Sequence, residues 1–335
     1  GKSFDGIGAY AKAVYSYFPK GIELEVFTGA CEASCPSVSR VLDMGMHRAF
    51  QQATPYCQND GVDFAIFHYP FVEWNPSGLS DYAQLAGTLH ALGGKTVLSV
   101  HEYARLNPIR KRVIERLAAH SDKMVVSSED MGSDLNRFCN DWKVRHIPSN
   151  IDVPDGIQVR ANRENFVYFG LINKAKAFEE MLRAWDSLED SKSVLHIITA
   201  SELGNIENKH KRIKYWRDLD DSEIVRIMSS CKACILPIRP MGDGKNASFA
   251  TAARCGCLCI GSFCDEYKTL PFTIDIKGYS PEDIADAIKQ TENIPGSTLM
   301  VIQRAALDYS QRFKASEVAS DIMSYLGGEA LSSSV

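Results

Sequence analysis

The apolar residues of the chain fall in short runs that are separated by longer amphipathic stretches. In the first half, these runs predict strands at residues 24–27, 64–67, 96–100, 124–126 and 144–147. The stretches between them repeat apolar residues at helical spacing and predict helices that include 10–18, 80–92 and 108–119. Short buried strands that alternate with helices are typical of a parallel sheet covered on both faces.

The same alternation begins again after a polar stretch at residues 152–164. It predicts strands at residues 166–169, 193–198, 233–237, 258–261 and 273–276. It predicts helices at residues 178–188, 222–230, 248–254 and 281–291. We therefore expect an α/β protein with two doubly wound domains, the first over 1–150 and the second over 151–310. Ligands of such domains bind at the carboxyl ends of the parallel strands.

Length and charge narrow the class of protein. A chain of 335 residues exceeds the size at which one hydrophobic core keeps growing, which agrees with two domains. The formal net charge of -5 argues against a general nucleic-acid-binding protein, since such proteins are basic. No apolar run reaches the roughly 18 residues that a membrane span requires, and residues 1–20 lack a signal-peptide pattern. We therefore expect a cytoplasmic protein that does not bind nucleic acid.

The 10 cysteines do not suggest a disulfide framework in a chain of this length, so we expect reduced thiols. Cys255, Cys257 and Cys259 alternate as the residues of a buried strand do. Cys231 and Cys234 form a CxxC pair, for which a zinc site would need a second well-spaced pair. Packing as small apolar side chains is the favoured interpretation, and no metal site is expected.

A glycine-rich segment, Asp5-Gly6-Ile7-Gly8, precedes the first predicted helix. Glycines before a helix allow backbone N–H groups to approach a phosphate, whose charge the helix N-terminus favours. A plain turn with two glycines would give the same pattern. Because a doubly wound domain normally opens with a strand before such a loop, we expect a strand that precedes residue 1.

Two histidines follow predicted strands of the first half. His101 comes after the run 96–100 and His68 after the run 64–67, so both imidazoles are expected at the carboxyl edge of the sheet. An imidazole there can hydrogen-bond a sugar hydroxyl or move a proton near neutral pH, with Glu102 as a partner. The alternative is a histidine whose hydrogen bonds are satisfied at the strand end.

The loop after the predicted strand 166–169 carries two lysines, Lys174 and Lys176. A lysine just ahead of a helix can reach a diphosphate as a point charge. An ordinary solvated loop lysine is the alternative for both positions.

The loop after the predicted strand 233–237 is rich in glycine and aspartate. Asp243 is placed to accept hydrogen bonds from sugar or ribose hydroxyls. Gly244 and the amides at the start of the next helix offer a cradle for an anion or a hydroxyl. Capping of that helix is the alternative role for Asn246 and Ser248.

These segments occur in the order found in retaining glycosyltransferases of GT-B fold, and the chain resembles the large family four of that class over nearly its whole length. The family's glycine-rich loop is similar to residues 5–8, and its strand-ending histidine is similar to His101. Its hinge resembles residues 148–152, its lysine loop residues 170–177, and its acidic glycine-rich segment residues 236–256. The resemblance implies two Rossmann-like doubly wound domains that face a central cleft.

The resemblance also implies a functional site. It assigns catalytic roles to His101 and Asp243. It assigns nucleotide-sugar binding, together with the patterns above, to Gly6, Gly8, Lys174, Lys176, Gly244, Lys245, Asn246, Ser248 and Thr251. Residues 311–335 are expected to include a helix that crosses back to the first domain.

The chain departs from the family pattern in its charged residues. The diphosphate-binding arginine of the family falls on Leu171, so that only the family's lysine is kept. The two glutamates of the family fall on Asp243 and Thr251, which shortens the first carboxylate and replaces the second by a hydroxyl. Lys174 or Arg239 could supply the missing positive charge.

The resemblance implies a retaining, metal-independent hexosyltransferase without a further cofactor. Its donor would be a UDP-sugar or GDP-sugar, and its acceptor a glycan, a lipid-linked acceptor or another hydroxyl compound, in cell-surface polysaccharide or glycoconjugate synthesis. A basic face at residues 105–116 would contact the inner face of an anionic membrane, unless it is an ordinary solvated helix face.

Two other functions keep the same fold. A GT-B nucleotide-sugar epimerase is one alternative, and a catalytically degenerate, transferase-like partner subunit is the other. A dinucleotide-dependent oxidoreductase lacks support, because no GxGxxG follows a predicted strand.

Overall fold

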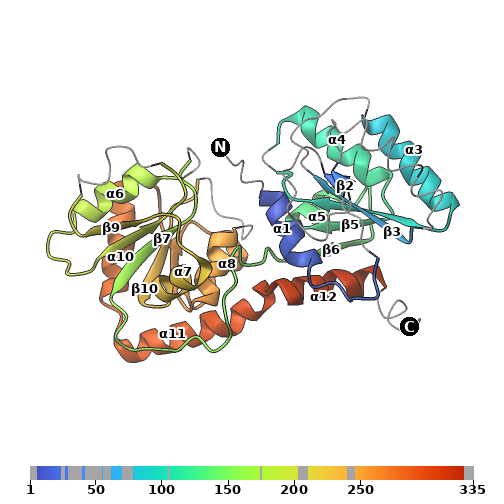
Figure 1. Cartoon of the computed structure of the whole chain (residues 1–335). Helices are drawn as coiled ribbons and strands as arrows, with labels where there is room; N and C mark the ends of the chain where they lie inside the picture. The colour runs from blue at the N-terminus through green and yellow to red at the C-terminus, as the bar shows by residue number, and fades with distance from the viewer. Residues whose placement is uncertain are drawn as a thin grey trace. The chain divides into compact units, whose positions relative to one another are not determined.

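The computed structural model describes residues 6–23, 27–28, 40–41, 55, 62–69, 78–104, 106–173, 176–202, 210–239 and 246–327 (Figure 1). The chain forms two compact units, and each is described by itself. Unit 1 comprises Gly1–His146 together with Val318–Val335, and unit 2 comprises Ile147–Glu317. Unit 1 thus ends four residues earlier than residue 150, and residues 311–317 belong to unit 2.

Unit 1 contains a four-stranded parallel sheet. Its strands, in their order across the sheet, are β3 (Phe64–Tyr69), β4 (Lys95–Val100), β5 (Lys123–Val126) and β6 (Trp142–Val144). A separate parallel pair is formed by β1 (Phe27–Thr28) and β2 (Arg40–Val41). The described helices that pack in this unit are α1 (Gly6–Tyr15), α3 (Gly78–Ala91), α4 (Pro108–Ala119), α5 (Glu129–Leu135) and α12 (Ala315–Leu326).

The two faces of this sheet carry different helices, because successive strand residues point to opposite sides. Leu98 and Met124 pack in the core that α3, α4 and α5 cover. Val97 and Val125 face the other way and pack against α1 and α12. Figure 1 shows α1 and α12 on the side of the sheet away from α3 and α4. The last helix therefore completes the core of the first unit.

Unit 2 contains a six-stranded parallel sheet. Its strands, in their order across the sheet, are β12 (Thr273–Asp275), β11 (Leu258–Gly261), β10 (Cys231–Leu236), β7 (Asn165–Phe169), β8 (Leu195–Ile198) and β9 (Ile213–Trp216). Its helices are α6 (Phe178–Asp186), α7 (Asp221–Met228), α8 (Ala247–Arg254), α9 (Asp265–Lys268), α10 (Pro281–Glu292) and α11 (Gly296–Tyr309), with the 3-10 turn η2 (Ser310–Phe313).

Alternation along the central strand β7 divides the core of unit 2 in two. Phe166 and Tyr168 lie in the cluster that α6 and α10 cover. Val167 and Phe169 lie in the cluster formed with α7 and α8. Continuous burial of both faces explains why β7 is apolar from Phe166 to Phe169 and β10 from Ala233 to Leu236.

The cysteines of this unit are free thiols, in agreement with packing as small apolar side chains. Cys231, Cys234, Cys255, Cys257 and Cys259 are all fully buried. The strand prediction for three of them needs correction, because β11 begins at Leu258 and leaves Cys255 and Cys257 in the preceding turn. Gly256 makes this turn with a φ of 70°, a conformation that glycine adopts at low cost.

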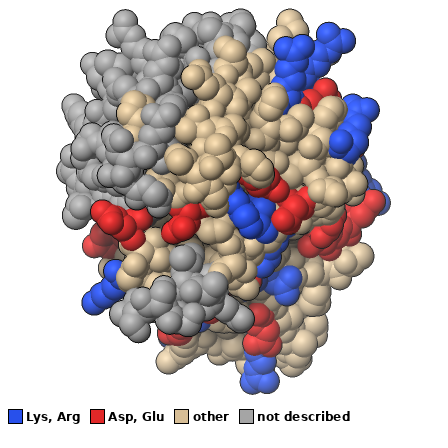
Figure 2. All heavy atoms as spheres, turned by 90° about the vertical axis from the view of Figure 1, so that its right-hand side faces the viewer, with Lys and Arg blue, Asp and Glu red and all other residues tan. Residues whose placement is uncertain are grey.

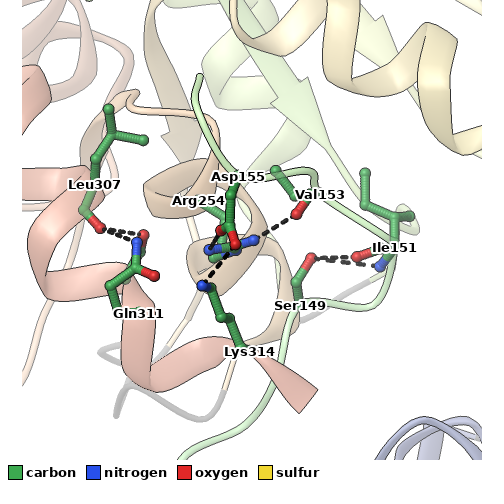
Figure 3. Close-up of polar contacts among 9 residues, drawn as sticks. Ser149, Ile151, Val153, Asp155, Arg254, Leu307, Gln311 and Lys314 are labelled. Atoms are coloured by element: carbon green, nitrogen blue, oxygen red, sulfur yellow. Dashed lines mark hydrogen bonds and ion pairs between the residues drawn. The ribbon is translucent and has the colours of Figure 1, made fainter. Parts of the chain in front are cut away.

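The segments by which the chain enters and leaves unit 2 are fastened to each other (Figure 3). The backbone N–H of Ser149 donates to the carbonyl of Phe313 over 3.0 Å. Asp155 accepts from Lys314 at 2.9 Å and from Arg254, at the end of α8, at 3.3 Å. Figure 3 shows the ammonium of Lys314 pointing toward Asp155 and Arg254, so one carboxylate joins both segments to α8.

Several predicted elements shift in the structure. The first helix begins at Gly6 rather than near residue 10, so Gly6 and Gly8 lie in its first turn and not in a preceding loop. The strand predicted at 144–147 is β6 at Trp142–Val144. The short α5 and the edge strand β9 were not predicted, because β9 is only half-buried and lacks the apolar pattern of a central strand.

Candidate functional site

The carboxyl end of β7 brings three groups of unit 2 together. Gly170 follows the strand with a φ of 132°, which an L-residue with a side chain rarely adopts. A Cβ atom at Gly170 would lie 2.9 Å from Lys176 Nζ and 2.9 Å from Ser248 Oγ. The lysine ammonium and the serine hydroxyl therefore both lie against the bare Cα of this glycine.

The backbone around Lys176 is held by the neighbouring strand. Lys176 forms an isolated antiparallel bridge with Ile238, just beyond β10. The N–H of Ala177 donates to the carbonyl of Pro237 at 2.8 Å, and the N–H of Lys176 donates to the carbonyl of Asn173 at 3.0 Å. Thus backbone hydrogen bonds join the loop after β7 to the loop after β10, and the lysine has a defined position at the sheet edge.

The charge of Lys176 has no anionic partner in the part of the chain that the structure describes. Its ammonium lies 5.3 Å from the centroid of the Tyr168 ring. Burial lowers the pKa of Lys176 to about 8. A half-buried cation without a counter-ion is costly on its own and favours the binding of an anion.

Helix α8 begins beside this lysine. Its N-cap is Asn246, whose side-chain oxygen accepts from the N–H of Ser248 at 2.8 Å. The side chain of Ser248 is buried, with its hydroxyl next to Gly170. The positive end of the helix dipole and Lys176 therefore act on the same region, which suits a phosphate group.

Thr251 and Arg239, which the sequence suggested for donor binding, are bonded to other residues of the protein. Thr251 is fully buried, and its hydroxyl bonds to the carbonyl of Ala247 and to Asn150 Oδ1, each at 2.8 Å. It joins α8 to the chain segment that enters unit 2, and it leaves no hydrogen to donate to a ribose. Arg239 pairs with Glu180 at 2.7 Å, so it does not supply the missing diphosphate-binding charge.

Lys174, Asp243, Gly244 and Lys245 lie outside the described residues. Their predicted roles, including the catalytic role of Asp243, stay predictions. Of the nucleotide-sugar residues that the sequence suggested, the structure brings together Lys176, Ser248 and the cap Asn246.

Unit 1 has its own group of polar side chains at the carboxyl edge of its sheet. His101 directly follows β4, and His68 lies within β3, one residue before the strand end rather than after it. His68 Nδ1 lies 2.9 Å from His101 Nε2. Nη2 of Arg145, which directly follows β6, lies 2.8 Å from His101 Nδ1. The hydroxyl of Tyr15, from α1, hydrogen-bonds His68 Nε2.

Burial and charge keep both imidazoles neutral. Burial, aided by the nearby charge of Arg145, lowers the pKa of His68 to about 3. The same two causes hold the pKa of His101 well below its ordinary value. Tyr10 of α1 covers the group, since its ring centroid lies 4.2 Å from the Arg145 guanidinium and 5.4 Å from that of the His101 ring. Neither histidine therefore changes its charge near neutral pH.

Sequence reasoning found the two histidines of this group and missed Arg145, Tyr10 and Tyr15. An arginine inside an apolar run such as 144–147 is the signal that could have indicated Arg145, because a charge there must be buried or bound. Glu102, named as a partner for His101, is exposed.

The basic helix α4 lies on the surface of unit 1. Arg110, Arg112 and Arg116 are exposed, and the neighbouring Ile109 is 68% exposed; Arg105 lies outside the described residues. On the face shown in Figure 2, the described basic and acidic side chains are interspersed. Among the described residues, none of the helices combines the length and the apolarity that crossing a lipid bilayer requires.

Comparison with known proteins gives the class of fold. No protein-family model matches the chain, and no curated protein matches it. Solved structures do. A glycosyltransferase from Rickettsia africae ESF-5 is 14% identical, with 91% of this chain and 84% of that chain covered and a TM-score of 0.63.

The chain has the GT-B fold. An alpha,alpha-trehalose-phosphate synthase (UDP-forming) from Burkholderia xenovorans, in complex with glucose-6-phosphate, is 13% identical, with 84% and 76% covered and a TM-score of 0.58. A trehalose-6-phosphate structure from E. coli, bound with UDP-2-fluoro glucose, is 11% identical, with 84% and 76% covered and a TM-score of 0.59. At such identities the shared property is the GT-B architecture, and membership of family four stays a prediction.

Proposed function

We propose that this protein is a glycosyltransferase that uses a nucleoside-diphosphate sugar as its donor. One observation carries the proposal. The ammonium of Lys176 has no anionic partner among the described residues, and it lies beside Ser248 at the start of α8, against the bare Cα of Gly170. A diphosphate at this sheet edge would supply the missing negative charge.

In the proposed reaction, the protein acts mainly by stabilising the charge on the leaving group. As the bond between the anomeric carbon and the diphosphate breaks, negative charge develops on the leaving phosphate. Lys176 and the amides at the start of α8 would stabilise that charge in fixed positions, which lowers the barrier. The acceptor hydroxyl then forms the new bond to the anomeric carbon, and its proton passes to an oxygen of the released diphosphate. We expect transfer with retention, without a metal ion, as the resemblance to family four implies.

The finer features of the donor and acceptor are part of the same proposal. A UDP-sugar is the favoured donor, because two of the similar structures are described with UDP-2-fluoro glucose or as UDP-forming. A hexose is the expected sugar, and a glycan or lipid-linked hydroxyl the expected acceptor. Since the similar structures are a glycosyltransferase and synthases, they favour transfer over epimerisation.

Contact of α4 with an anionic membrane is a separate part of the proposal. The exposed arginines and the exposed Ile109 support it, because a basic and apolar helix face suits an anionic lipid surface. Cosedimentation with anionic vesicles but not with neutral ones would support this contact. Equal binding to both kinds of vesicle would contradict it.

Nucleotide binding tests the main proposal. Isothermal titration of the protein with UDP, GDP, ADP and CMP should give one clear binder. In Lys176→Met, that affinity should fall by roughly ten- to a hundredfold, the value of a charge-assisted contact. Lys289→Met removes an exposed lysine of α10 and should leave the affinity unchanged. The proposal fails if no nucleotide binds, or if Lys176→Met binds as tightly as the unmodified protein.

A further inference from the structure

The guanidinium of Arg145 is buried, and it has hydrogen-bonding capacity that the described protein does not use. Its side chain is 2% exposed. Nη2 bonds to His101, while Nε and Nη1 are buried and have no partner in the described part of the chain. No described carboxylate pairs with Arg145. Leaving N–H groups of a charged side chain unpaired in the interior costs free energy, so a partner is expected.

The hydrogen bonds show which groups already have partners. Arg145 Nη2 lies 2.8 Å from His101 Nδ1 and 3.2 Å from His101 Nε2, and it donates to whichever of them carries no proton. His101 Nε2 also lies 2.9 Å from His68 Nδ1. His68 Nε2 forms its hydrogen bond with the hydroxyl of Tyr15. Both ring nitrogens of each histidine are therefore occupied within the protein.

This arrangement bears on the role of His101. The sequence suggested that its imidazole could hydrogen-bond a sugar hydroxyl or move a proton, but both of its ring nitrogens already contact other side chains. Arg145 keeps the Nε hydrogen and both hydrogens on Nη1. Hence Arg145, and not His101, is the group of unit 1 with capacity for a ligand, and the two histidines position it.

Other buried groups without a partner lie in the same part of the sheet. Ser99 pairs in register with His68 on one side and with Val125 on the other, and Val125 packs beneath α1. Ser127 directly follows β5. The hydroxyls of Ser99 and Ser127 are buried, and neither has a hydrogen-bond partner in the described part of the chain.

We propose that Arg145, with these hydroxyls, binds an oxyanion: a phosphate or carboxylate substituent of the acceptor. The location supports this, because Arg145 and His101 directly follow β6 and β4, at the strand ends where doubly wound domains bind ligands. The fixed positive charge and the neutral hydroxyl donors suit an anion, and no described carboxylate would repel it. That the anion belongs to an acceptor rests on the function proposed above; the anion site itself does not.

Inorganic phosphate is a direct probe of the site. We would label the histidines of the whole protein and record their imidazole carbon signals during a phosphate titration. Phosphate at Arg145 should move the signals of His68 and His101, because an anion bound to the arginine changes the electric field at the imidazole that Arg145 contacts and at the imidazole hydrogen-bonded to it. The signal of the exposed His90 serves as an internal control and should move little. Acetate in a parallel titration separates carboxylate binding from phosphate binding.

Two variants give the test its specificity. Arg145→Gln should weaken phosphate binding by roughly ten- to a hundredfold. In Lys176→Met, phosphate should still move the His68 and His101 signals. This variant therefore tests the Arg145 site independently of the proposed nucleotide site in unit 2. If Arg145→Gln does not fold, the His68 and His101 signals of the unmodified protein still show whether the anion binds. Unmoved His68 and His101 signals with both anions, or an unchanged response in a folded Arg145→Gln, would overturn the proposal.

Discussion

Lys176 in unit 2 and Arg145 in unit 1 are both cations at the carboxyl edge of a parallel sheet, and they differ in how they are held. Lys176 is half-buried on a loop, beside a glycine, and burial lowers its pKa to about 8. Arg145 is almost fully buried beneath an aromatic ring and bonds to a neutral histidine. A lysine can lose its proton near such a pH, whereas an arginine stays charged. The first site should therefore respond to pH and the second should not.

The largest expected effect comes from filling the space above Gly170. In Gly170→Ala, the new Cβ would lie 2.9 Å from Lys176 Nζ and Ser248 Oγ, at a φ of 132°. We expect donor nucleotide affinity to fall by roughly a hundredfold, with a loss of about 1–3 kcal/mol of stability from backbone strain.

Gly156→Ala is the matched control for this change. Gly156 also has a positive φ, 82°, but its Cβ would meet nothing within 4 Å. It should lose stability without losing affinity, as measured by denaturation and by titration. Equal losses of affinity in the two variants would show that the effect is strain rather than obstruction of the Lys176 site.

The pH dependence of donor binding comes next. Because burial lowers the pKa of Lys176 to about 8, its charged form is present below that pH and is lost as the pH rises through it. A bound diphosphate holds the proton, so affinity for a UDP-sugar should be full near neutral pH. Above about pH 8 it should fall by about tenfold per pH unit at most.

Lys176→Arg sharpens this prediction, because arginine stays charged over the whole range. Its affinity for the same UDP-sugar, measured by titration calorimetry at each pH, should not fall above about pH 8. A decline of equal size in Lys176→Arg and in the unmodified protein would assign the pH dependence to another group.

A smaller effect is expected at Tyr15 in unit 1. In Tyr15→Phe, His68 Nε2 loses its hydrogen-bond partner. A buried polar group without a partner costs about 1–3 kcal/mol, which chemical denaturation would detect. Tyr17→Phe removes a hydroxyl from a residue that is 56% exposed, and its effect should lie within about 0.5 kcal/mol. If the two variants are equally stable, the hydrogen-bonded chain through the histidines does not contribute as described.

The smallest effect is expected for a cation that already has its partner. Lys314 bonds to Asp155, whose side chain is 67% exposed. Solvent screens such a pair, so Lys314→Met should lower stability by at most about 1 kcal/mol and leave nucleotide affinity unchanged. A larger loss in thermal or chemical denaturation would show that the joined segments of Figure 3 contribute more than an ordinary surface pair.

The parts of the fold that follow from local patterns were predictable from the sequence. Buried strands such as β7 and β11 appear as short apolar runs, and helices such as α4 and α10 begin with a cap followed by proline. Lys176 was also identifiable, because it stands between a strand and a helix. These features depend on residues that are close together in the chain.

The features that the sequence did not predict depend on contacts between distant segments. The burial and the contacts of Arg145 arise only in the folded chain, where β6 pairs with β5 and α1 packs over this part of the sheet. Arg239 forms its ion pair with Glu180, and Thr251 forms a hydrogen bond with Asn150. Both partners lie far away in the sequence. No periodicity reports such pairings, so the roles of these residues could be assigned only from the folded chain.

The return of the chain to unit 1 has a consequence for the order of folding during synthesis. Val97, Val125 and Tyr10 form one apolar cluster with Val318 and Ile322 of α12. Because a ribosome makes α12 after all of unit 2, this face of the first sheet lacks its last helix while 171 residues, Ile147–Glu317, are added. The emerging first unit thus exposes apolar surface for longer than a unit made from one continuous segment would. The second unit, whose incoming and outgoing segments are hydrogen-bonded to each other, can complete its own core first.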